Sequence, residues 1–433
     1  MEASTSKTLF EISILAKYTP KEAATEILIF VKQTFPQINA VKIKINQSKV
    51  SLNSVNGFIV TADGKEYFFK FHTEEGEEVS LQKNEYYQAE ELEKAGLPMI
   101  SPIYESTEPG SQFLIYEKIT ALTAFDEFEK EENRYKETGE YDETHKTELL
   151  KAESKITAQQ TRVYLATLKL IQSEKNEDAA LYQLFLNRLV GRHGGEPRLD
   201  IFYTNQDVKL PEETLNFNEL AKLRWVINGV EFPESLEDII EKAKKLLNPN
   251  KNEQIPVVLG HGDCHNGNKF FIDGQFKFFD PAFAGWQPAL LSFIKSTAHN
   301  TFLHPFWLYD PKSIEDDLEI HYEIKDGKII VDHNWDLEDN APIRTEVLKL
   351  QIENVWKPLI KTLKEKGWLP DDWQEYIRKA LFCCPFLVYN LIDPSKYPPA
   401  QSLLALSKCV ELGSKGDKLN LLEYFIEQIT PKE

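Results

Sequence analysis

Cysteine is scarce in this chain and long apolar runs are missing, and both features exclude classes of protein. The four cysteines are Cys264, Cys383, Cys384 and Cys409; two are adjacent and none has the spacing of metal ligands. They are interpreted as small apolar packing residues, which fits a reducing cytoplasm. No apolar run reaches the roughly 18 residues that a membrane-spanning helix needs. Residues 1–7 lack a basic region followed by an apolar core, so no secretory signal is expected.

Basic residues are outnumbered as well. The chain has 50 Lys and Arg against 69 Asp and Glu, a net charge of −19. This balance disfavours nucleic acid and anionic membranes as partners, because both require clustered Lys and Arg. An acidic surface would attract a cationic small molecule such as an amino sugar or an amine alcohol, although solubility explains the charge equally well.

The most informative segment is residues 261–268, which reads HGDCHNGN, followed by FFDP at residues 278–281. Between them, two apolar runs flank Asp273-Gly274, a pattern that predicts a tight hairpin. This hairpin would return the chain so that Asp280 faces Asn268, and two oxygen ligands would then converge, as a hard cation requires. The plainer alternative is that these motifs are ordinary turns around a hairpin.

The spacing of the polar groups matches a known chemistry. Asp263 and Asn268 are five positions apart, as in the catalytic loop of protein kinases. Phosphoryl transfer needs one carboxylate that positions the acceptor hydroxyl, and an amide and a second carboxylate that hold magnesium.

These residues resemble the aminoglycoside phosphotransferase family, which is part of the protein-kinase-like superfamily that also includes choline kinases. The resemblance implies that Asp263 is the catalytic residue and that Asn268 and Asp280 are the Mg²⁺ ligands. His265 is expected to brace the loop rather than to act as a general base.

The resemblance extends upstream, to a segment that reads as strand, turn, strand, turn, strand. Small polar residues at Ser54 and Asn56 would let the backbone approach the phosphates of ATP. Lys70 follows an aromatic strand, where a lysine should lie on an edge or have a partner; the resemblance implies that it holds the α- and β-phosphates. Its partner would be Glu85 on the next helix, with Glu90 and Glu91 as alternatives.

The strand at residues 112–119 turns polar near Glu117 and looks like the hinge whose backbone would bind adenine. One departure follows Asp280. The family usually has Gly-Asp-Pro and a further Asp there, whereas residues 284–288 read AGWQP and contain neither acid. This puts the usual anchoring of the catalytic loop in doubt.

Other segments predict helices and a second hairpin. Thr19-Pro20 with Glu22 has the pattern of a capping-box helix start. The acidic run at residues 121–150 is typical of a solvated helix or a mobile insertion, and a role in binding the acceptor stays open. Asp326-Gly327 predicts a hairpin within residues 318–337, and residues 344–429 are mostly helical.

The predicted fold is therefore α+β, a two-lobed protein-kinase-like fold. Residues 1–118 would form a nucleotide-binding lobe with a small antiparallel sheet, and residues 119–433 a mainly helical lobe with the catalytic loop, metal site and acceptor pocket. The predicted function is ATP-dependent transfer of the γ-phosphoryl group to a hydroxyl of a small, cationic or sugar-like acceptor. A protein kinase and a nucleotide-binding pseudokinase or scaffold are the alternatives. The sequence leaves the acceptor and the oligomeric state open.

Overall fold

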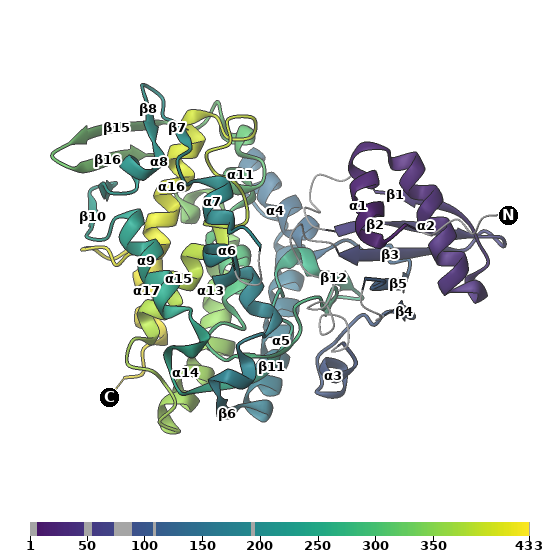
Figure 1. Cartoon of the computed structure of the whole chain (residues 1–433). Helices are drawn as coiled ribbons and strands as arrows, with labels where there is room; N and C mark the ends of the chain where they lie inside the picture. The colour runs from purple at the N-terminus through teal and green to yellow at the C-terminus, as the bar shows by residue number, and fades with distance from the viewer. Residues whose placement is uncertain (1–6, 47–53, 73–88, 107–109, 192–194, 433) are drawn as a thin grey trace. The chain divides into compact units, whose positions relative to one another are not determined.

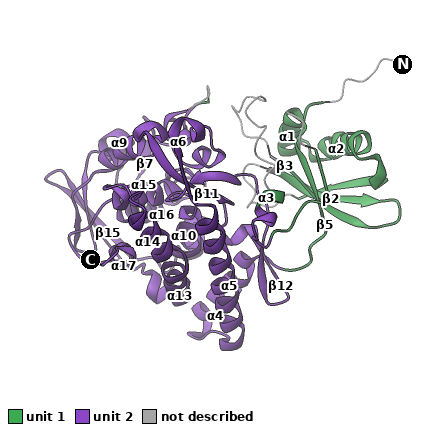
Figure 2. Ribbon diagram, turned by 90° about the horizontal axis from the view of Figure 1, so that it is seen from below, with its two compact units in different colours: residues 1–91, 99–121, 193–195 green, residues 92–98, 122–192, 196–433 purple. Residues whose placement is uncertain are grey.

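The computed structural model describes residues 7–46, 54–72, 89–106, 110–191 and 195–432 (Figure 1). Two compact units make up the chain: residues 1–91, 99–121 and 193–195 form the first, and residues 92–98, 122–192 and 196–433 form the second (Figure 2). The first unit contains an antiparallel sheet and the second is mainly helical, so the predicted α+β class is confirmed.

The sheet of the first unit has five strands in the order β1-β2-β3-β5-β4, and every neighbouring pair is antiparallel. The strands are β1 (Ala40–Ile45), β2 (Ser54–Thr61), β3 (Glu66–His72), β4 (Tyr104–Ser106) and β5 (Phe113–Glu117). The strands predicted around Ser54, Lys70 and Glu117 are present. β3 is the middle strand, so Lys70 does not lie on an edge.

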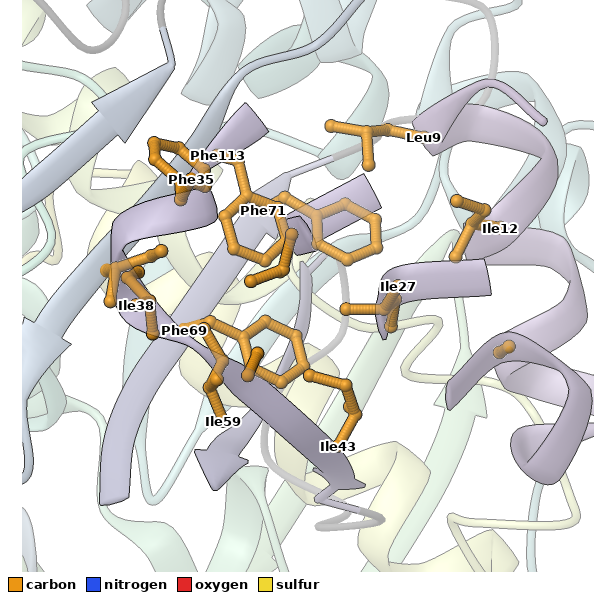
Figure 3. Packing of buried hydrophobic residues seen from close by; sticks show 14 residues of the cluster. Leu9, Ile12, Ile27, Phe35, Ile38, Ile43, Ile59, Phe69, Phe71 and Phe113 are labelled. Atoms are coloured by element: carbon orange, nitrogen blue, oxygen red, sulfur yellow. The ribbon is translucent and has the colours of Figure 1, made fainter. Parts of the chain in front are cut away.

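One face of this sheet is covered by α1 (Leu9–Tyr18) and α2 (Pro20–Thr34). Phe69 and Phe71 of β3 are fully buried there and stack on Phe113 at ring-centroid distances of 5.3 and 5.5 Å (Figure 3). Because side chains alternate along a strand, Lys70 lies on the opposite face from this aromatic core.

The predicted start of α2 is correct at Pro20 but wrong in its cap. Thr19 makes no side-chain hydrogen bond to the first turn of α2. Its hydroxyl instead donates to the carbonyl of Leu15 at 3.4 Å, because Thr19 also ends α1. The two helices are joined through this residue, and the capping box cannot form.

The second unit contains most of the helices. They are α4 (Ala124–Thr138), α5 (Glu143–Thr167), α6 (Leu186–Val190), α7 (Arg198–Phe202), α8 (Phe217–Leu220), α9 (Leu236–Leu246), α10 (Ile294–Thr297), α11 (Pro305–Leu308), α12 (Leu337–Asn340), α13 (Pro342–Gln351), α14 (Lys357–Glu365), α15 (Trp373–Phe386), α16 (Pro399–Gly413) and α17 (Leu421–Ile429). A short helix, α3 (Ala89–Lys94), begins in the first unit and ends in the second. No helix of the described ranges is long and apolar enough to cross a membrane.

Short sheets complete the second unit. Their strands are β6 (Lys169–Gln172), β7 (Asp207–Lys209), β8 (Thr214–Asn216), β9 (Arg224–Ile227), β10 (Val230–Phe232), β11 (Gln254–Gly260), β12 (Lys269–Ile272), β13 (Gln275–Phe278), β14 (Gly285–Pro288), β15 (Ile320–Lys325) and β16 (Lys328–His333). The hairpin predicted at Asp326-Gly327 is the β15–β16 pair, and β16 also pairs in parallel with β9.

The acidic run departs from the expectation of a solvated helix. Glu132 of α4 is fully buried, and its carboxylate accepts hydrogen bonds from Arg344 of α13 at 2.5 and 3.2 Å. His304 lies 3.3 Å from the same carboxylate. The neighbouring Glu131 is also buried and accepts a hydrogen bond from the backbone of Asp142. These two acids join α4 to the rest of the helical unit.

Replacing Arg344 with Met should destabilise the protein by about 3–5 kcal/mol, because Glu132 would remain as a buried charge without its main partner. Chemical denaturation followed by tryptophan fluorescence measures this loss. The matched control is Lys361→Met, which breaks the exposed pair with Glu365 at 3.8 Å. Equal midpoints for the two variants would contradict the structural role of the buried pair.

Candidate active site

The segment predicted to be the catalytic loop, residues 261–268, connects two strands of the second unit. It follows the buried strand β11 and ends in a single helical turn, Asn266–Asn268, before β12 begins. The side chain of Asn268, 9% exposed, donates through Nδ2 to the backbone carbonyl of Asp263 at 2.9 Å. The same Nδ2 lies 3.5 Å from the Asp263 carboxylate. This bond fixes the amide so that Oδ1, the atom a metal would need, is left for other contacts.

The hairpin brings Asp280 to this loop as predicted. β12 and β13 pair in register from Lys269 opposite Phe278, and the turn residues Asp273 and Gly274 both have positive φ. The N–H of Phe279 then donates to the carbonyl of Asn268 at 2.9 Å. Asp280 therefore directly follows Phe279, the residue whose backbone pairs with Asn268.

Asp280 itself adopts a strained backbone conformation. Its φ is +58°, in the left-handed region that costs a non-glycine residue about 1–2 kcal/mol. His261, which precedes Asp263 in the loop, is fully buried and donates through Nε2 to the carbonyl of Phe279 at 2.8 Å. Strain that is held by surrounding contacts in this way is typical of functional sites.

The Asp263 side chain is 15% exposed and lies among cations. Burial alone would raise the pKa of this carboxyl. Lys295, whose Nζ lies 3.6 Å from Oδ1, is the largest opposing influence, and the net effect lowers the pKa to about 2. Asp263 is therefore ionised at neutral pH, although it is nearly enclosed.

His265 braces the loop, as the sequence predicts. Its Nδ1 accepts a hydrogen bond from the N–H of Gly267 at 3.0 Å and so caps the turn that carries Asn268. Burial is the main cause that lowers its pKa to about 4, so the ring is neutral at pH 7. A neutral ring with one nitrogen committed to the backbone suits a structural role.

Gln287 anchors the loop where the sequence lacks the usual acids. Its side chain is 1% exposed, and Nε2 donates to the carbonyls of Gly260 and Phe283 at 3.0 and 2.6 Å. These carbonyls lie just before the loop and just after Asp280. The anchoring that the missing acids put in doubt is thus provided by an amide. In the sequence, Gln287 stands as a polar residue in an otherwise apolar segment, and this was the signal that could have identified its anchoring role.

Lys269 is a second anchor that sequence reasoning missed. It directly follows Asn268, is 1% exposed, and forms an ion pair at 2.6 Å with Glu153 of α5, which is fully buried. Gln351 of α13 donates to the other oxygen of Glu153 at 3.2 Å. A charge pair shielded from water holds the start of β12 against two helices.

The residues predicted to contact ATP lie in the first unit, and the structure brings two of them together. Asn56 of β2 lies directly opposite Lys70 of β3 in the sheet, and both are half-buried. Glu117 ends β5, with an exposed side chain 3.9 Å from Lys65. Ser54 begins β2, but its side chain lies outside the described residues, as does the whole of Glu85.

The predicted metal ligands suit Mg²⁺ by their chemistry. Asn268 and Asp280 supply an amide oxygen and a carboxylate, and Mg²⁺ is usually bound by one or two protein oxygens together with substrate phosphates. Within the described ranges, no group of three or more His, Cys, Asp or Glu side chains could hold a metal. A cavity of about 630 Å³ in the second unit is lined by none of the predicted site residues.

Comparisons with known proteins found distant similarity to solved structures. No family model matches the chain, and no curated protein sequence matches it. Similar solved structures include an amicoumacin kinase in complex with AMP-PNP, Ca²⁺ and Ami (TM-score 0.43, 13% identity, 93% of this chain and 95% of that chain). A glucosamine kinase has a TM-score of 0.40 at 13% identity, over 84% of this chain and 82% of that chain. Choline kinase from Cryptosporidium parvum Iowa II has a TM-score of 0.35 at 12% identity, over 89% of this chain and 93% of that chain. At such distant similarity, the roles of residues rest on the site itself.

Gly262 provides a test of how tightly the loop is held. Its φ is +82°, and a Cβ there would lie 2.5 Å from the carbonyl oxygen of Phe283. Gly274 in the hairpin turn has a similar φ of +70° but open space around it. Ala at Gly274 should cost about 1–2 kcal/mol from backbone strain alone. Ala at Gly262 should cost about 1–3 kcal/mol more from overpacking. Urea denaturation of the two variants measures the difference in their free energies of unfolding. Equal midpoints would show that the loop shifts to accommodate a Cβ at Gly262 without added cost.

Proposed function

We propose that this chain is an ATP-dependent phosphotransferase that transfers the γ-phosphoryl group to a hydroxyl of a small molecule. The observation that carries the proposal is the arrangement of three side chains: an ionised, nearly enclosed Asp263, the Asn268 amide fixed against it, and Asp280 held next to Asn268 by the hairpin. An acceptor-orienting carboxylate beside two oxygen ligands is what phosphoryl transfer requires.

Asp263 would accept a hydrogen bond from the acceptor hydroxyl and receive its proton. The acceptor oxygen then forms a bond to the γ-phosphorus as the bond from that phosphorus to the β,γ-bridging oxygen breaks, and ADP leaves. Asn268 and Asp280 would hold Mg²⁺, which supplies neutralisation of the phosphate charge when bound. A carboxyl with a pKa near 2 is a weak base, so Asp263 would act mainly by orienting the hydroxyl.

The residues of the first unit would hold the nucleotide. Lys70 would contact the α- and β-phosphates, with Glu85 as its ionic partner. Ser54 and Asn56 would lie along the phosphates, and the backbone at Glu117 would bind adenine. The register that sets Asn56 opposite Lys70 supports a shared phosphate-binding role for this pair.

The segment after Asp280 favours a small acceptor over a folded protein. β14 (Gly285–Pro288) begins five residues after Asp280 and pairs with β11 along its full length. Gln287 fixes it further. A protein kinase needs a long activation segment in this place to bind its peptide, and the chain here is committed to a sheet.

Asp263→Asn should lower kcat by about 10²–10⁴-fold, because the variant keeps the shape of the side chain but loses the charge that orients the hydroxyl. The affinity for ATP with Mg²⁺ should change little, since Asp263 acts on the acceptor. Calorimetry and a coupled ADP assay measure the two quantities. Turnover near that of the parent would remove Asp263 from the mechanism.

Asp280→Asn should abolish most of the gain in ATP affinity that Mg²⁺ provides, because the charged carboxylate would be the stronger of the two groups that hold the metal. Asp273→Asn is a matched control: Asp273 lies in the turn of the same hairpin, is exposed, and also has positive φ. Calorimetric titrations of ATP with and without Mg²⁺ compare the variants. A Mg²⁺ dependence unchanged from the parent in Asp280→Asn would move the metal site elsewhere.

A further inference from the structure

The two carboxylate oxygens of Asp263 have different surroundings. Oδ2 lies toward the predicted metal side, 3.5 Å from Asn268 Nδ2 and 3.6 Å from His265 Nε2. Oδ1 is buried and has no hydrogen-bond partner in the part of the chain that the structure describes. It faces Nζ of Lys295 at 3.6 Å. Because Oδ1 is enclosed, the exposed part of the side chain, which an acceptor hydroxyl would reach, lies on the Oδ2 side.

Lys295 is a buried cation on the Oδ1 side of this carboxylate. It lies on α10, its residue is 5% exposed, and among the described residues its ion pair within 4 Å is with Asp263. Arg188, 8% exposed, adds a second positive charge that acts on the same carboxylate. A buried ammonium is costly without compensation, so its position beside Asp263 calls for a role there.

Lys295 also sets the donor-to-acceptor direction of a chain of hydrogen bonds that runs through His299 to Tyr309. An ammonium can only donate, so it donates to Nε2 of His299 at 3.0 Å. Burial, followed by the charge of Lys295, holds the pKa of His299 well below its usual value, so the ring is neutral. Its proton is then on Nδ1 and is donated to the hydroxyl oxygen of Tyr309 at 2.5 Å. The hydrogen of the Tyr309 hydroxyl is thereby directed toward a further acceptor.

Tyr309 extends this chain of hydrogen bonds toward the protein surface, because its side chain is only half-buried. Its ring meets Phe125 and Tyr389 edge to face, at centroid distances of 5.8 and 5.7 Å. Lys396 lies 3.0 Å from the centre of the Tyr389 ring, and burial lowers the pKa of this lysine to about 8, with Asp310 and Asp393 opposing that effect. The wall that leads away from Asp263 therefore presents the Tyr309 hydroxyl and the Lys396 cation, with the acids Asp310 and Asp393 near that lysine.

We propose that Lys295 and Tyr309 bind the acceptor beside its reacting hydroxyl, and that they select a hydroxy acid over an amine. This inference rests on the proposed function. A carboxylate on the acceptor would receive hydrogen bonds from the Lys295 ammonium and the Tyr309 hydroxyl while its neighbouring hydroxyl meets Asp263. An ammonium in the same position would face Lys295 and Arg188 and be repelled.

The acidic run does not offset these cations. Glu131 and Glu132 are buried, and Glu132 is neutralised by Arg344, whose guanidinium also donates to the carbonyl of His299 at 3.1 Å. Glu127 lies 3.2 Å from His145. Glu127, Glu131 and Glu132 thus serve the packing of α4, whereas Glu129 of the same helix is half-buried and its pKa is raised mainly by burial. For the group beside the reacting hydroxyl, the inference is the opposite of the cationic acceptor that the sequence predicts.

The test compares acceptors that carry a hydroxyl, a carboxylate or an ammonium group at the same end of the molecule: glycerol, glycerate and 3-amino-1,2-propanediol, and a hexose with its uronic acid and its 6-amino-6-deoxy analogue. The parent enzyme should prefer the acid to the amine by about tenfold or more in kcat/KM, which corresponds to about 1.4 kcal/mol. Lys295→Met should remove this preference, mainly through a higher KM for the acid, and Lys295→Arg should keep it. Tyr309→Phe should raise the KM of the acid with a smaller change in kcat.

Lys379→Met is the matched control, because Lys379 is a fully buried lysine of the same unit that pairs with Glu234 and Glu375. Its loss should lower stability but leave the acid-to-amine ratio unchanged. A parent that prefers amines, or a ratio that survives both Lys295→Met and Tyr309→Phe, would overturn the inference alone. Should Lys295→Met fail to fold, the parent ratio and Tyr309→Phe still decide. Turnover with none of the six acceptors would contradict the proposed function as well.

Discussion

The compensation of one nearly enclosed negative charge, that of Asp263, is the constraint on which the rest of the site depends. Burial acting alone would raise the pKa of a carboxyl that is only 15% exposed. Lys295, with a smaller contribution from Arg188, opposes this rise. The loop must then be held rigidly, because the balance depends on distances of 3–4 Å. Gln287 and Lys269 supply that rigidity at the two ends of the loop, through Gly260 before it and through Glu153 after it.

This balance determines what Asp263 can do. A pKa near 2 keeps the carboxylate charged and available as a hydrogen-bond acceptor, at the expense of its strength as a base. In phosphoryl transfer, positioning with electrostatic stabilisation provides most of the acceleration. A fixed, ionised and weakly basic carboxylate is suited to that demand.

Much of the fold and of the site's layout could be predicted from the sequence, because the signals were local. The Asp273-Gly274 turn between two apolar runs defines the hairpin, and the hairpin alone brings Asp280 back to Asn268. The sheet around Lys70 follows in the same way from alternating aromatic residues.

What could not be predicted depends on partners that are distant in the chain. Glu132 reads as a solvated helix residue until Arg344, 212 positions away, is placed beside it. Lys295 carries no local signal at all, and only the folded chain sets it against Asp263. The same holds for Gln287, whose anchoring role follows from pairing between β11 and β14. Burial of a charged or polar side chain is a property of the tertiary fold, so its consequences for acceptor binding appear only there.

The most direct test of the central claim is to follow the terminal phosphate of ATP. The chain would be incubated with γ-labelled ATP, Mg²⁺ and a mixture of small hydroxyl compounds, and the labelled products would be separated and identified. The account predicts that the label moves to a hydroxyl of a small molecule. Label found only on protein, only as inorganic phosphate, or still wholly in ATP would contradict it.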